Sequence, residues 1–127
     1  MTPFSTRRLS EAAEVRAPDG SGVRPLCTLP GAASFAHFAL APGQVSTAVA
    51  HATVEEIWYV VGGSGRMWRR QGTREEVTEL VPGVCLTIPL GTAFQFRGGF
   101  EGLQVVAATT PPWPGTGEEA SPVPGHW

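Results

Sequence analysis

The sequence predicts an all-β fold of about nine short strands, arranged as a barrel or a sandwich. First, short β-prone runs begin at Val23 and show almost no helical periodicity. Second, these runs are separated by breaks of turn type that contain glycine or proline. Third, a length of 127 residues suits one domain with a single core. The runs are VRPLCTL, SFAHFALA, QVSTAVA, EIWYVV, RMWRR, REEVTEL, VCLTI, AFQFR and GLQVVAA.

The chain divides into three parts. Residues 1–22 form a weakly patterned N-terminal segment, in which Ser10 is placed to cap one short helix, EAAEVR. Residues 23–110 carry the strand pattern and form the barrel. Residues 111–127, PPWPGTGEEASPVPGHW, contain too much proline for a regular element. The tryptophans of this last part predict an arm that lies across a surface.

Composition excludes several classes of protein. No apolar run approaches the roughly 18 residues that would span a bilayer, and no signal-type stretch follows the first arginines, so a cytoplasmic location without membrane contact is expected. A net charge of −2 gives no reason to expect nucleic-acid binding. The chain has no lysine, which excludes Schiff-base chemistry and a P-loop. Cys27 and Cys85 lack CxxC spacing and are expected to be free thiols.

Two stretches match a known pair of motifs. GQVSTAVAHATVEEIWYVVGG has a glycine at 43, then Val49-Ala50-His51, then Glu56 and Gly63. This spacing resembles the first signature of the cupin superfamily, in which a glycine precedes H-x-H, a glutamate and a second glycine. GVCLTIPLGTAFQFRG resembles the second cupin signature from residue 83 onward, with Phe94 at the histidine position and Gly98 at the asparagine position. The resemblance implies a cupin-type double-stranded β-helix, or jelly-roll, barrel.

The resemblance also implies a metal site, but half of its ligands are missing. Metal-binding cupins place three histidines and one glutamate inside the barrel, and only His51 and Glu56 fill those positions here. Val49 and Phe94 stand at the other two and have no lone pair to donate. His37 is a weak candidate for a third ligand, because a histidine in an apolar strand is more often structural. No metal or other cofactor is therefore expected. If a metal binds, it should be a divalent transition metal at His51 and Glu56.

Strand alternation suggests how the interior is lined. Glu56 and Trp58 share one face of their strand, while Glu55 faces the other way. His51 and Glu56 could act as an acid–base pair, or they could be a buried polar pair without a function. The apolar pocket around them is expected to be lined by Val49, Trp58, Phe94 and Phe96.

Three functions remain open. The first is metal-independent binding of a small molecule in the apolar barrel pocket. The second is a metal-independent isomerase, epimerase or cyclase that uses His51 and Glu56 as acid and base. The third is a metal-dependent oxygenase with an incomplete ligand set. The expected partners are a small-molecule ligand and, because cupins of this size commonly pair edge to edge, a second copy of the chain.

Overall fold

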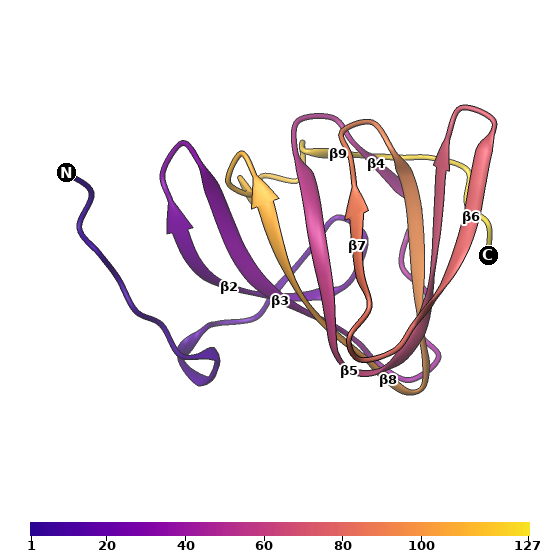
Figure 1. Cartoon of the computed structure of the whole chain (residues 1–127), viewed down its shortest axis with the longest axis horizontal. Helices are drawn as coiled ribbons and strands as arrows, with labels where there is room; N and C mark the ends of the chain where they lie inside the picture. Colours follow the sequence, from indigo (N-terminus) through magenta and orange to yellow (C-terminus); the bar gives the residue numbers. More distant parts are fainter.

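The protein is a single curled antiparallel sheet of nine strands, preceded by an extended N-terminal segment (Figure 1). The computed structural model describes residues 1–127. The only helical segment is one 3-10 turn at Leu9–Glu11, and no helix is long and apolar enough to cross a membrane. The strands are β1 (Val15–Arg16), β2 (Gly22–Leu29), β3 (Ala33–Leu40), β4 (Val49–His51), β5 (Glu55–Gln71), β6 (Arg74–Leu80), β7 (Cys85–Ile88), β8 (Ala93–Thr110) and β9 (Ala120–Pro122).

The two long strands, β5 and β8, run side by side through both halves of the sheet. In one half, the start of β5 pairs with the end of β8, and the half is completed by β7 on one side and by β3, β2 and β1 on the other. In the other half, the end of β5 pairs with the start of β8, flanked by β6 and by β4 and β9. The halves curl toward each other and enclose the core (Figure 1).

Glycines allow the two long strands to turn this corner together. The pairing of β5 with β8 shifts register between Val60 and Gly62 and again between Gly63 and Gly65. Gly63 has φ of +69°, and a Cβ there would collide with the backbone of Gly102. A side chain at this position would therefore suffer both backbone strain and a steric clash.

Aromatic and aliphatic side chains fill the space between the halves. Trp58 stacks on Phe38 with ring centroids 5.7 Å apart, and it meets Phe96 in a T-shaped arrangement with centroids 4.9 Å apart. Phe94 stacks on Phe96 at 6.5 Å. Trp58, Phe94 and Phe96 are each 1% exposed, so these rings are packed on all sides.

The predicted fold class and the predicted register are confirmed. Glu56, Trp58 and Val60 are buried along β5, whereas Glu55 and Ile57 are exposed. The core-facing side of β5 therefore carries the residues that the alternation of side chains along a strand predicted for it.

Two expectations about the ends of the chain were wrong. The predicted helix EAAEVR is reduced to the turn at Leu9–Glu11, and Val15 instead pairs with Val23 as part of β1. The C-terminal segment does contain a regular element, because residues 120–122 form β9 against β4. In both places, pairing with a neighbouring strand edge decides the local structure, and a short segment carries too little sequence pattern to reveal such pairing.

We expect Gly63→Ala to destabilise the barrel by more than about 3 kcal/mol, because strain and the clash with Gly102 add together. Gly72→Ala is the matched control, since Gly72 also has positive φ, +58°, but has open space around its Cα. Its cost should be about 1 kcal/mol. Urea unfolding measures the free energy of unfolding of both variants. Equal losses of stability would show that the corner does not depend on the close approach of Gly63 to Gly102.

Candidate functional site

The candidate site is a small cavity between the two halves of the sheet. His51, at the end of β4, and Glu56, at the start of β5, both line it. Their side chains are only 9% and 5% exposed, and His51 Nε2 lies 3.8 Å from Glu56 Oε1. That distance is too long for a hydrogen bond. The structure thus brings together the two polar residues that the sequence singled out.

Two further carboxyl groups, Asp19 and Glu119, line the same cavity. Asp19 lies between β1 and β2, and Glu119 directly precedes β9. They are 7% and 1% exposed. Sequence reasoning missed both because it treated the terminal parts of the chain as separate from the barrel. For Asp19, the only available signal was that it is the single aspartate of the chain. Nothing local distinguished Glu119 from the adjacent Glu118.

Backbone contacts fix these two terminal segments over the site. The Thr47 N–H donates to the Asp19 carbonyl oxygen at 2.7 Å, and the Ala52 N–H donates to the Glu119 carbonyl oxygen at 2.8 Å. The Glu119 side chain accepts a hydrogen bond from Trp113 Nε1 at 2.7 Å. Trp113 also lines the cavity, so the segment from Trp113 to Glu119 covers it. The cavity volume is about 20 Å³, which is close to the minimum that holds one water molecule.

Hydrogen bonds hold Glu56 in one orientation. Its Oε1 accepts from Trp58 Nε1 at 3.2 Å, and its Oε2 accepts from the Thr109 hydroxyl at 2.9 Å. Burial nevertheless raises the pKa of Glu56 from 4.5 to about 7, because desolvation disfavours the carboxylate more than these two hydrogen bonds favour it. The nearby Asp19 carboxyl raises the pKa further. Both protonation states of Glu56 are therefore populated near neutral pH.

His51 is shifted in the opposite direction. Burial lowers its pKa from 6.5 to about 4, although the Glu119 carboxyl opposes this shift. The 3.8 Å approach of His51 to Glu56 resembles a salt bridge, but the directions of the two pKa shifts argue against one. Desolvation dominates at this depth, so between about pH 4 and pH 7 the pair consists of a neutral imidazole and a neutral carboxyl.

Two polar atoms of the site have no hydrogen-bond partner. They are His51 Nδ1 and Glu119 Oε2, both buried. Unpartnered polar atoms are costly in a protein interior and are uncommon in folded proteins. One nitrogen and one oxygen at the same cavity are thus free to bind a polar ligand.

The residues present do not fit a metal ion. Val49 and Phe94 are direct partners across β4 and β8, so an adjacent apolar pair occupies two of the four positions that hold ligands in metal-binding cupins. The Phe94 ring lies 4.9 Å from the His51 ring and fills space beside it. No group of three or more histidine, cysteine, aspartate or glutamate side chains is spaced to hold a metal ion. His37 points away from the core face of β3, so it cannot supply a third ligand.

The aromatic lining differs from the expected one. Val49 does line the cavity. Trp58, Phe94 and Phe96 do not, because they pack against one another in the core. The site is consequently polar and titratable on several sides rather than an open aromatic pocket.

Solved structures with the same architecture cover nearly the whole chain. Streptomyces PAC13, described as a nucleoside dehydratase and solved with uridine, superposes with a TM-score of 0.74 at 16% identity, over 97% of this chain and 92% of that one. The chain has the cupin fold. KdgF from Halomonas sp. matches with a TM-score of 0.72 at 20% identity, over 86% of this chain and 94% of that one.

A third cupin is a larger protein. Oxalate decarboxylase from B. subtilis gives a TM-score of 0.75 at 17% identity, over 97% of this chain but only 33% of that one. No protein-family profile matches the chain, and no curated protein sequence matches it. These likenesses establish the cupin fold, and the function has to be argued from the site.

Folding should transfer a proton from His51 to Glu56, which predicts opposite pH dependences for two variants. The raised pKa of Glu56 gives stability that is lost as pH rises from 4.5 toward about 7. The lowered pKa of His51 gives stability that is lost as pH falls from 6.5 toward about 4. Between pH 4.5 and 6.5 these two slopes cancel in the native protein.

His51→Gln should therefore lose stability as pH rises through that window, relative to the native protein, by about 1.4 kcal/mol per pH unit. Glu56→Gln should gain stability by about the same slope. Urea unfolding across the window measures both, with His37→Gln as the control expected to parallel the native protein. Parallel curves for all four proteins would contradict the inferred proton transfer.

We also expect the double variant Val49→His, Phe94→His to bind a divalent transition metal. The two new imidazoles would face each other across β4 and β8 and would join His51 and Glu56. Metal analysis after dialysis should find about one equivalent in the double variant. Each single variant should bind more weakly. A full equivalent in the unmodified protein would instead show that His51 and Glu56 suffice.

Proposed function

We propose that this protein is a metal-independent enzyme that catalyses proton transfer on a small polar substrate, by isomerisation, epimerisation, cyclisation or dehydration. One observation carries the proposal. His51 and the Glu56 carboxyl group lie 3.8 Å apart in a buried cavity. Two buried atoms at the same cavity, His51 Nδ1 and Glu119 Oε2, have no hydrogen-bond partner. Buried titratable groups with perturbed pKa values, gathered at one cavity, are typical of catalytic sites.

Glu56 is assigned the proton transfer itself. Its carboxyl group is held by Trp58 and Thr109, so it presents a fixed geometry to a substrate. A pKa of about 7 allows it to give up and to regain a proton near neutral pH with little cost in either direction. It would remove a proton from the substrate in one step and return a proton, to carbon or to a leaving hydroxyl, in the next.

His51 is assigned the role of a neutral hydrogen-bonding partner. With a pKa of about 4 it stays uncharged through the neutral range, so it offers one N–H donor and one lone pair. The Phe94 ring packs against it, with the ring centroids 4.9 Å apart and the ring planes at 61°. Its Nδ1 is available to orient a substrate hydroxyl or to accept a proton transiently.

Substrate entry requires the C-terminal segment to move. The cavity volume of about 20 Å³ is far below the several hundred Å³ of ordinary small-molecule sites. The covering residues lie between β8 and β9 and include Trp113 and Glu119, which are joined by a hydrogen bond. Displacement of this segment would open the cavity to a substrate. A segment that closes over the substrate would also exclude water during reaction.

The structural neighbours add support at the level of reaction class. PAC13 is described as a nucleoside dehydratase, and dehydration needs one group that removes a proton and one that protonates the departing hydroxyl. Glu56 can take both roles in turn, while the neutral His51 orients the substrate. At 16% identity to PAC13, the substrate of this protein does not follow from that of PAC13, so nucleosides are only the first compounds to test. Binding without chemistry ranks second because the aromatic pocket expected for it is filled.

Incubation with uridine and a panel of other nucleosides and sugar acids in D2O tests the proposal. Proton transfer should introduce solvent deuterium into a carbon position of the substrate, followed by NMR. Glu56→Gln should slow this exchange by about 100-fold or more and should remove a pKa near 7 from its pH profile. His51→Gln should also slow it.

His37→Gln, which changes a histidine on the outer face, is the matched control and should leave the exchange rate unchanged. If a compound of the panel binds but no deuterium enters it, and if Glu56→Gln leaves that binding intact, the protein is a binding protein and the enzymatic proposal is wrong.

A further inference from the structure

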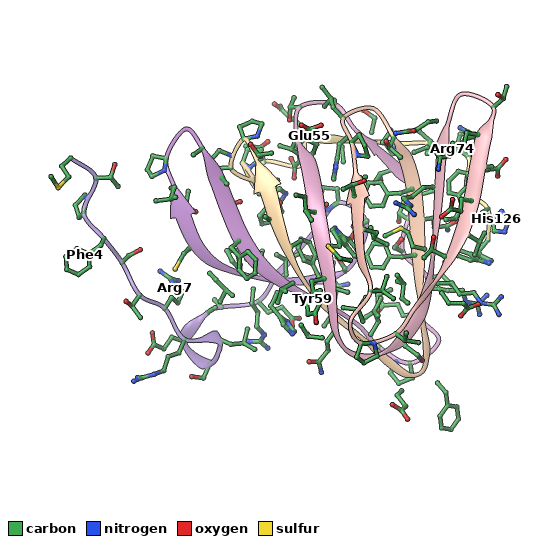
Figure 2. All side chains as sticks on the ribbon, in the orientation of Figure 1. Phe4, Arg7, Glu55, Tyr59, Arg74 and His126 are labelled. Atoms are coloured by element: carbon green, nitrogen blue, oxygen red, sulfur yellow. The ribbon has the colours of Figure 1, made fainter.

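A second polar site lies away from the His51–Glu56 cavity, between the end of the β5–β6 hairpin and β7. It is a groove of about 250 Å³, and none of its eight lining residues is hydrophobic. β6 and β7 each pair only with β5, so they are edges of opposite halves of the sheet, and the groove lies where these edges approach. Arg74, at the hairpin, marks its position (Figure 2).

Three guanidinium groups line this groove. Arg69 and Arg70 come from β5, and Arg74 begins β6. One carboxylate, Glu76, also lines it. Three positive charges and one negative charge leave +2 in the groove, in a chain whose net charge is −2. This local excess of positive charge runs against the charge of the whole protein, so it favours an anion at this position.

Arg69 is built into the groove rather than lying free on the surface. Its side chain is 21% exposed, and its Nη1 donates to the Thr87 carbonyl oxygen at 2.9 Å, which ties β5 to β7. Its Nη2 contacts the Glu76 carboxylate at 3.2 Å and the Thr78 hydroxyl at 3.1 Å. The Nε–H is buried and has no partner. A fixed guanidinium with one free, desolvated N–H is a strong donor for an oxyanion.

Two further donors of the groove, Arg70 and Gln71, are also held in place. The Arg70 guanidinium lies over the Trp68 ring, 5.4 Å from its centroid, which restricts the side chain. Gln71 Nε2 donates to the Thr92 hydroxyl at 2.9 Å, which leaves the Thr92 O–H free to donate to a ligand. Arg74 is 78% exposed and only 3.8 Å from Glu76, so it can swing toward a bound anion at little cost.

We propose that this groove binds the phosphate group of a small metabolite. Phosphate fits better than a single carboxylate, because a dianion matches the +2 charge of the groove. The groove is a binding site independent of the proton-transfer chemistry proposed above. A failure of the proposed proton transfer would therefore leave the phosphate proposal unaffected, and the reverse also holds.

Titration with inorganic phosphate at low ionic strength, followed by NMR, tests the site on the full chain. The Arg69 Nε–H resonance and the Thr92 amide should shift saturably with millimolar affinity, and added salt should weaken the binding. Sulfate should compete with phosphate, whereas acetate should compete much less. The double variant Arg70→Gln, Arg74→Gln should weaken phosphate binding by about tenfold or more.

Two further variants test whether the charge of the groove itself controls phosphate binding. Glu76→Gln keeps an oxygen that can accept from Arg69 but removes the negative charge, so it should tighten phosphate binding by about threefold. Arg7→Gln removes one positive charge from the exposed N-terminal segment and should leave phosphate binding unchanged (Figure 2). The absence of a saturable shift, or equal weakening by Arg7→Gln and the double variant, would overturn the proposal.

Discussion

The close approach of β5 and β8 at their shared corner is the constraint on which the rest of the barrel depends. Gly63, Gly65 and Gly98 lack a Cβ where the backbone of a neighbouring segment comes nearest. The two strands can therefore continue from one half of the sheet into the other while staying paired. Had either strand ended at the corner, the halves would be joined only by loops, and their inward faces would not be held in register.

The candidate site is a direct product of that corner. Glu56 is opposite Thr109 in one half, whereas Val49 is opposite Phe94 in the other. Val49 and Glu56 both line the cavity between the halves, and His51 Nε2 lies 3.8 Å from Glu56 Oε1 there. The short distance between His51 and Glu56 therefore depends on how β5 and β8 bend.

Burial determines the chemistry of the polar residues. In water, His51 would hold a proton more tightly than Glu56, but desolvation reverses that order because it penalises the charged form of each group. A neutral pair avoids the cost of placing an uncompensated ion pair in the core. The terminal segments produce this environment, because Asp19 and the residues from Trp113 to Glu119 close the cavity from outside the barrel proper. The domain ends are therefore part of the site.

Side-chain packing, as well as the missing ligands, makes the site unfit for a metal ion. Val49 and Phe94 are cross-strand neighbours, and such apolar pairs stabilise a sheet. Phe94 also contacts His51 and Phe96 through its ring. The space that would be needed for an ion and its ligands is occupied by side chains that hold the two halves together.

The sequence by itself determined the fold class, the strand register and the pairing of His51 with Glu56. Alternation along β5 and the glycine–proline skeleton are local patterns, so they survive without knowledge of the tertiary structure. Only the tertiary structure decided that Trp58, Phe94 and Phe96 are packed rather than exposed to a pocket, and that Asp19 and Glu119 join the site. Asp19 is 32 residues from His51 along the chain, and Glu119 is 68 residues from it. No local pattern encodes contacts at that separation, because they arise from how the sheet curls and from where the two ends of the chain pack against it.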